Sequence, residues 1–174
     1  MSKAPQLPEW SALAPMPDAQ LPLFETALLI ARDEYPDLQA GEYIALVTDY
    51  ADRLKKSLRQ NLDLPSKLTA INHFLYRELG FSGNEHEYAD PRNSYLNQVF
   101  DRKLGIPISL AVVQIEVMRR IGLDLDGISF PGHYLVRLPV DDGILVLDPY
   151  NQGRPVGFEE LRERVAPPMD GQMP

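Results

Sequence analysis

The chain has 174 residues, the usual size of one domain, and is long enough to bury a hydrophobic core. Its formal net charge is −8, so general attraction to nucleic-acid phosphates is not expected, and no apolar run is long enough to span a membrane. The absence of cysteine excludes disulfides and thiolate-ligated zinc, and the first residues form no signal-peptide pattern, so we expect a cytoplasmic protein.

The two ends of the chain are rich in proline. Residues 1–20 predict a flexible Pro-rich arm, and residues 166–174 predict a linker-like tail. Between them we expect a single domain over residues 21–165. Its helical half covers residues 21–80, and residues 81–165 hold a central helix and a sheet.

Apolar residues recur at helical spacing through the first half. Residues 23–35, 41–61 and 65–80 each predict an amphipathic helix, and the last of these ends at Gly80. A short helix is expected from about Asn93 to Lys103. The stretch that follows, GIPISLAVVQIEVMRRIG, predicts a helix that begins at about Ile108 and is apolar on nearly every side. Such a helix is normally buried, so we expect it at the centre of the domain.

From Gly127 the pattern changes from helices to strands. GISFPGHYLVRL and GILVLDPY predict two antiparallel strands, and GFEELRERV predicts a terminal helix. Helices first and strands last indicate segregated layers, hence an α+β fold rather than an alternating α/β fold.

Three residues of the second half follow the order nucleophile, histidine, aspartate: Ser109 at the helix start, then His133 and Asp148 on the strands. If they meet, Asp148 orients His133, His133 accepts the proton of Ser109, and Ser109 attacks a carbonyl group. The first N–H groups of the helix would then stabilise the oxyanion. A purely structural interpretation also exists: Ser109 caps the helix, His133 is a hydrogen-bonded structural histidine, and Asp148 starts a turn.

Whether His133 and Asp148 meet depends on the register of the two strands. The favoured register places the two residues directly opposite each other and ends the first strand before Pro139, because proline cannot donate a ladder hydrogen bond. Residues 139–142 then form the loop. A tight Asp-Gly turn would instead place Asp148 opposite Arg137.

The polar loop FSGNEHEYADPRNSYLN is expected to wall a cleft beside these three residues. The candidate cleft residues are Asn93, Tyr95, Asn97 and Tyr134, of which Asn93 or Asn97 could donate to a bound carbonyl group. The alternative is that Asn84, Asp90 and Asn93 only cap and turn the chain. The sequence has only three histidines and no pair of them at helical spacing, so we expect no metal site. It also lacks a glycine-rich phosphate-binding loop, so we expect no cofactor.

Five motifs occur in a fixed order: INHFLYRELGFSGN, YADPRNSYLNQVF, GIPISLAVV, FPGHYLVR and DPYNQG. Together they resemble a bacterial transglutaminase-like family of the invasion-regulator type, whose members often carry tetratricopeptide repeats after the core. The resemblance covers roughly residues 21–165 and implies a papain-like α+β core. In such cores a cysteine opens the central helix, and here Ser109 matches that cysteine, His133 the histidine and Asp148 the aspartate.

Serine in place of the cysteine weakens the case for catalysis, because a thiol is partly ionised at neutral pH whereas a serine hydroxyl depends entirely on its base. We therefore expect a regulatory or protein- or peptide-binding domain with little or no transglutaminase activity, without a cofactor and without binding to nucleic acid or membrane. The alternative is a serine-dependent amidase, protease or acyltransferase that uses Ser109, His133 and Asp148.

Overall fold

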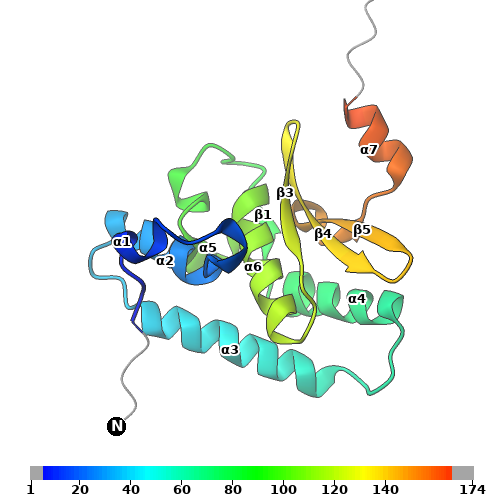
Figure 1. The fold of residues 1–174 in the computed structure, drawn as a ribbon, viewed down its shortest axis with the longest axis horizontal. Helices are drawn as coiled ribbons and strands as arrows, with labels where there is room; N and C mark the ends of the chain where they lie inside the picture. Colours follow the sequence, from blue (N-terminus) through cyan, green and yellow to red (C-terminus); the bar gives the residue numbers. More distant parts are fainter. Residues whose placement is uncertain (1–5, 166–174) are drawn as a thin grey trace, which may run out of the picture.

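The fold is known from a computed structural model, which describes residues 6–165. Helices dominate the first two thirds of the chain (Figure 1). The helices are α1 (Trp10–Leu13), α2 (Leu23–Glu34), α3 (Ala40–Ser57), α4 (Leu64–His73), α5 (Leu96–Arg102), α6 (Pro107–Arg120) and α7 (Phe158–Val165). The short 3-10 turns are η1 (Asp18–Gln20), η3 (Pro91–Asn93) and η4 (Pro149–Asn151), and a π-helical turn, η2 (Phe74–Glu78), follows α4.

Two sheets complete the fold. The larger has the strand order β3-β4-β5-β6 and is antiparallel throughout, with β3 (Asp126–Phe130), β4 (His133–Val140), β5 (Gly143–Asp148) and β6 (Arg154–Pro155). The smaller is a parallel pair, β1 (Ser82–Gly83) and β2 (Leu104–Gly105). Helices come first and the main sheet last, so the predicted α+β class is confirmed.

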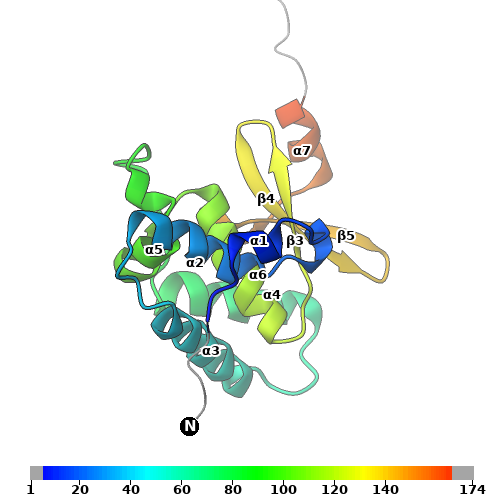
Figure 2. The ribbon, with the colours of Figure 1, turned by 60° about the vertical axis from the view of Figure 1, so that its left-hand side comes forward.

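Helix α6 lies between the other helices and the main sheet, as Figures 1 and 2 show. It is the buried central helix that the sequence predicts, and it begins one residue earlier than expected, at Pro107. Two polar side chains, besides that of Ser109 near its start, are buried along it. Gln114 accepts a hydrogen bond from the Tyr76 hydroxyl (2.9 Å), and Glu116 is paired with Arg120 (2.7 Å), so neither is left unpaired in the core.

The segment predicted as one helix over residues 65–80 changes its winding near its end. Helix α4 ends at His73, and the wider π-helical turn of η2 follows. Gly80 then ends the segment as predicted, with φ of +80°, a left-handed conformation that glycine adopts at little cost. The turn carries Tyr76, whose hydroxyl reaches Gln114 on α6.

The N-terminal segment differs from the flexible arm predicted over residues 1–20. Trp10–Leu13 form α1, and Leu7 and Leu13 are buried in the hydrophobic cluster that extends to Leu147 on β5. Prolines restrict the backbone of this segment, but they do not prevent its leucines from packing against the helices that follow. Residues 1–5 and the predicted tail, residues 166–174, lie outside the described part of the chain.

The first predicted strand is a hairpin in the structure. Phe130 pairs with His133, so Pro131 and Gly132 form a two-residue turn between β3 and β4. Proline favours the first central position of such a turn, and Gly132 has φ of +71°, which suits the second. The Pro-Gly pair therefore ends one strand and begins another.

Both predicted registers of β4 and β5 are wrong. Val140 pairs with Gly143, which leaves a two-residue turn, and Pro139 lies within β4 opposite Ile144. The pair that closes a two-residue hairpin exchanges both of its hydrogen bonds, so the next pair, at Pro139, exchanges none with β5. The nitrogen of Pro139 therefore points towards the β3 side, where no β3 residue is paired with it, because β3 begins at Asp126, opposite Arg137. For this reason proline is tolerated here.

None of the helices between residues 6 and 165 is both long enough and apolar enough to cross a membrane.

Candidate functional site

His133 and Asp148 are hydrogen-bonded to each other. The distance from His133 Nε2 to Asp148 Oδ1 is 2.7 Å, and the exposed fractions of the two side chains are 13% and 0%. His133 is the first residue of β4, and Asp148 is the last residue of β5. The predicted contact between the two residues therefore exists, although the predicted register does not.

The contact is a diagonal one across the sheet. In the observed register Val136 pairs with Leu147, which places Asp148 across from Leu135 and two residues away from the position opposite His133. Residues 133 and 135 share one face of β4, and diagonal neighbours on one face are within reach of long or aromatic side chains. A two-residue displacement thus keeps Asp148 on the face that His133 occupies.

The carboxylate of Asp148 has several partners besides His133. Its Oδ1 also accepts a hydrogen bond from the Asn151 backbone N–H (3.2 Å), and its Oδ2 accepts one from the Asn151 side chain (2.7 Å). The Arg164 guanidinium on α7 lies 3.8 Å from Oδ2. Asp148 therefore caps η4, as its structural interpretation predicts, and at the same time fixes the His133 ring.

The Ser109 hydroxyl lies in a different set of hydrogen bonds. It accepts a hydrogen bond from the Ile106 N–H (3.0 Å) and lies 2.6 Å from the backbone carbonyl oxygen of Asn93, to which it donates. The exposed fraction of Ser109 is 4%. Ser109 is the third residue of α6, where a side chain that accepts from the preceding N–H closes the helix start.

No hydrogen bond joins Ser109 to His133 among residues 6–165. The Ser109 proton is directed at a backbone carbonyl, and the Nε2 atom of His133 is used by Asp148. General-base activation needs the base within about 2.6–3.2 Å of the hydroxyl it deprotonates. The structure thus joins two of the three predicted catalytic residues by a hydrogen bond, and the hydroxyl of the third is bonded to Ile106 and Asn93 instead.

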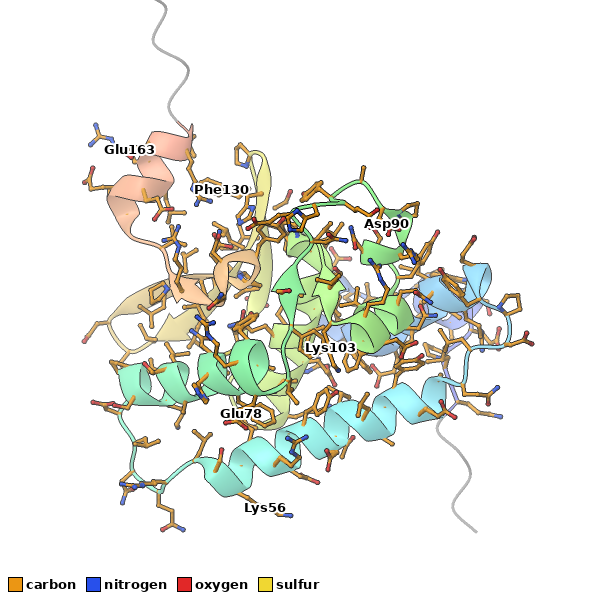
Figure 3. All side chains as sticks on the ribbon, turned by 180° about the vertical axis from the view of Figure 1, so that it is seen from behind. Lys56, Glu78, Asp90, Lys103, Phe130 and Glu163 are labelled. Carbon is orange, nitrogen blue, oxygen red and sulfur yellow. The ribbon has the colours of Figure 1, made fainter. Side chains whose placement is uncertain are left out.

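Asn93 has no free amide group to offer to a ligand. Its side-chain N–H groups donate to the carbonyl oxygens of Glu87 (2.8 Å) and Tyr88 (3.2 Å), and its Oδ1 accepts from Asn84 (3.1 Å). Asp90, labelled in Figure 3, caps η3 through the Arg92 N–H. In this structure the Asn93 amide shapes the loop, and its backbone carbonyl binds Ser109, so the contacts of Asn93 match its structural interpretation.

None of the other three predicted cleft residues forms a side-chain hydrogen bond with His133 or Asp148 within the described part of the chain. Tyr95 packs edge-on against Tyr35, with 5.5 Å between ring centroids. Asn97 is buried on α5, and its Oδ1 has no hydrogen-bond partner within the described residues. Tyr134 follows His133 on the same strand and so faces the opposite side of the sheet, where it packs on the core and over Gly127.

Aromatic side chains adjoin His133 instead. The Tyr150 ring meets the His133 ring edge-on at 6.0 Å, and Tyr88, whose exposed fraction is 53%, meets Tyr150 at 6.1 Å. Burial, with smaller contributions from Glu85 and Tyr88, raises the pKa of Tyr150 above its usual value. The rings of Tyr150 and Tyr88 therefore extend from His133 towards solvent.

Several residues of this region were not found by reading the sequence. Asn151 carries a local signal, because asparagine three residues after Asp148 matches the spacing of a capped turn. Tyr76 and Arg164 carry none, because they belong to distant elements. Burial, followed by the charge of Asp148, raises the pKa of Tyr76, which keeps this buried phenol neutral behind the site.

Across residues 6–165 no group of three or more His, Asp or Glu side chains is arranged to hold a metal ion.

Comparison with known families gives one match: the Transglutaminase-like superfamily matches residues 41–173. A UPF0162 protein of Xylella fastidiosa (strain 9a5c) is 61% identical over 168 residues, which are 97% of this chain and 60% of that protein. A UPF0162 protein of Vibrio cholerae serotype O1 is 30% identical over 74% of this chain and 48% of its own length.

A eukaryotic relative matches a smaller part. F-box only protein 21 of Mus musculus is 39% identical over 84 residues, which are 48% of this chain and 13% of that protein. No solved structure matches. The chain thus spans about 60% of the length of the Xylella protein described above.

Proposed function

The chain belongs to the transglutaminase-like superfamily, and we propose that within it the chain is a regulatory or protein- or peptide-binding domain with little or no transglutaminase activity. One observation carries this proposal. The Ser109 hydroxyl donates to the backbone carbonyl of Asn93 and accepts from Ile106, so its single proton and its acceptor site are both engaged away from His133.

The geometry of His133 supports the same proposal. Its Nε2 is hydrogen-bonded to Asp148, and the same Asp148 carboxylate accepts two hydrogen bonds from Asn151 of η4. His133 therefore belongs to the hydrogen-bond network that holds η4. A histidine that serves as base in a triad is held through one ring nitrogen and offers the other to the nucleophile. No hydroxyl of a described residue is hydrogen-bonded to the remaining nitrogen, Nδ1.

The alternative is a serine-dependent amidase, protease or acyltransferase. It requires the Ser109 hydroxyl to leave Asn93 and Ile106 and to turn towards His133. That movement would leave the Ile106 N–H and the Asn93 carbonyl without their present partner, at a cost of about 1–3 kcal/mol for each buried group. The favoured function needs no such rearrangement.

An activity assay on cysteine variants separates the two functions. Ser109→Cys supplies the thiol that the family chemistry uses, and the expected result is no gain in ester hydrolysis, amide hydrolysis or amine transfer, because the side chain at this position faces Asn93. Ser129→Cys is the matched control, since Ser129 is exposed on β3 and adds the same single thiol. A gain in Ser109→Cys that disappears after a further His133→Ala change would favour the enzyme.

The narrower assignments rest on the sequence. The invasion-regulator type of the family follows from the resemblance of the five motifs. The cytoplasmic location follows from the absence of cysteine and of a signal-peptide pattern, and the absence of nucleic-acid and membrane binding follows from the net charge of −8 and the lack of a long apolar run. We include these assignments in the proposal on that basis.

A further inference from the structure

An apolar groove opens beside the start of α6. It has a volume of about 300 Å³ and lies where α2, α5 and α6 pack together (Figures 1 and 2). The apolar side chains that line it are Leu23, Ala27 and Ile30 of α2, Leu96 of α5, and Ile108 and Val112 of α6. Ser109 also lines it, whereas His133 and Asp148 do not.

Large aliphatic side chains from two helices are exposed along this groove. The exposed fractions are 49% for Ile30, 47% for Ile108 and 36% for Leu23. A single exposed isoleucine is ordinary on a protein surface, but a contiguous group that borders a hollow is typical of an interaction site. On α2 the group repeats at positions 23, 27 and 30, which is the spacing of one helix face.

The same face of α2 ends in negative charge. Asp33 and Glu34 follow Ile30 by three and four residues, so they lie on its face one turn further along the helix. Both are exposed, and neither is in an ion pair within the described residues.

The nearby cations are turned away or occupied. Arg32 is two residues from Ile30, lies on the opposite side of α2, and lines a separate hollow with Leu7. Arg92, which is two residues before the groove residue Ser94, is bound by Asp90 at 2.7 Å. The groove is therefore mostly apolar, with Thr26, Ser94 and Ser109 as its polar lining, and it is acidic at the end marked by Asp33 and Glu34.

We propose that this groove binds an amphipathic helix of a partner protein, with apolar side chains three to four residues apart and Lys or Arg at the end that lies over Asp33 and Glu34. The proposal rests on the binding function proposed above, and it specifies the secondary structure and the charge of the partner. A helix is the fitting occupant because a groove between helices accepts an apolar helix face. Leu23 and Ile30 are two turns apart, roughly 10 Å, so two turns of the partner would fill the groove.

Charge supports a basic partner. The chain carries a formal net charge of −8, which repels acidic helices and attracts basic ones. Asp33 and Glu34 also favour one orientation of the partner helix, the one that places its basic end over these two carboxylates. The partner's orientation is therefore expected to be fixed by these two carboxylates and its affinity by Leu23, Ile30 and Ile108.

The test uses a displayed library of helical peptides of about 16 residues, with one face randomised among apolar residues and both ends randomised among Lys, Glu and Ser. Peptides selected on the wild-type protein are then measured by fluorescence anisotropy. The expected peptides carry an apolar face and a basic end. Ile30→Glu and Ile108→Glu are each expected to weaken their binding about tenfold or more, since both side chains line the groove and are about half exposed.

Charge reversal and a control complete the test. Asp33→Lys with Glu34→Lys is expected to weaken binding roughly threefold to tenfold and to reduce its dependence on salt. Ile144→Glu is the matched control, because Ile144 is 57% exposed on β5, away from the groove, and it is expected to change nothing. Melting temperatures would establish that each variant is folded.

Four results would overturn the proposal: no enriched peptide, enriched peptides with acidic or uncharged ends, binding that Ile144→Glu weakens as much as Ile30→Glu, or a dimer by sedimentation that Ile30→Glu dissolves. The last would assign the groove to a second copy of the chain. These results are independent of Ser109 chemistry. Activity in Ser109→Cys would contradict the non-catalytic function without moving peptide binding.

Discussion

Replacing Ser109 with alanine is expected to destabilise the protein rather than merely silence it. The substitution removes an acceptor from the Ile106 N–H and a donor from the Asn93 carbonyl, at distances of 3.0 Å and 2.6 Å. Each hydrogen bond contributes about 1 kcal/mol net, and a buried group left unpaired costs more, so the expected loss is about 2–3 kcal/mol. For a chain of this size that corresponds to a decrease in melting temperature of roughly 5–10 °C.

Urea titration and thermal melting measure this loss. Ser129→Ala is the control, because Ser129 is exposed on β3 and forms no side-chain hydrogen bond, and it should change the free energy of unfolding by less than about 0.5 kcal/mol. A serine kept for catalysis would behave differently, since functional residues commonly contribute nothing to stability. Equal stabilities of Ser109→Ala and Ser129→Ala would therefore refute the structural role of the Ser109 hydroxyl.

Three further predictions concern the buried and paired groups. Asp148→Asn should lower the free energy of unfolding by about 2–4 kcal/mol in urea titrations, because the buried carboxylate that accepts from His133 and Asn151 loses its charge and one of its acceptor atoms. An unchanged urea midpoint would contradict this role of Asp148. Burial raises the pKa of Tyr76, and burial together with Asp101 raises that of Tyr43 to about 12, so the stability from these neutral phenols is complete below pH 10 and is lost as the pH rises towards 12. Replacing both tyrosines with phenylalanine should flatten this loss in unfolding titrations from pH 9 to pH 12. The hydrogen bond from Arg154 lowers the pKa of Glu160 from 4.5 to about 2, so the ion pairs that hold α7 are present above pH 4.5 and are lost as the pH falls towards 2. Amide exchange in α7 should accelerate over that range, and Glu160→Gln should exchange rapidly even at neutral pH.

The helices were predictable because their signals are local. The apolar stripes of α2 and α3 and the all-round apolar surface of α6 follow from spacing alone. The π-helical winding of η2 and the burial of Leu7 and Leu13 were not predictable, because each depends on packing against elements far away in the chain. The strand register failed for a related reason: the penalty for Pro139 depends on where β3 begins, which the sequence of the β4–β5 hairpin does not reveal.

The site shows the same division between local and distant information. The spacing of His133 and Asp148 along neighbouring strands predicted a contact, and the contact survives a register error because a shift by two residues keeps the same face. The order of residues could not predict where the Ser109 hydroxyl points. Its partner, the carbonyl of Asn93, is a backbone atom sixteen residues earlier, and it is positioned by the loop that the Asn93 side chain organises.

The central claim is that Ser109 is not a nucleophile activated by His133, and covalent labelling tests it most directly. Wild-type protein and His133→Ala would be treated with a fluorophosphonate, and the site of any adduct mapped by mass spectrometry. The expected result is no adduct at Ser109 in either protein, because the hydroxyl is buried and donates to Asn93. An adduct at Ser109 in the wild type that disappears in His133→Ala would contradict the account and establish a working serine and base.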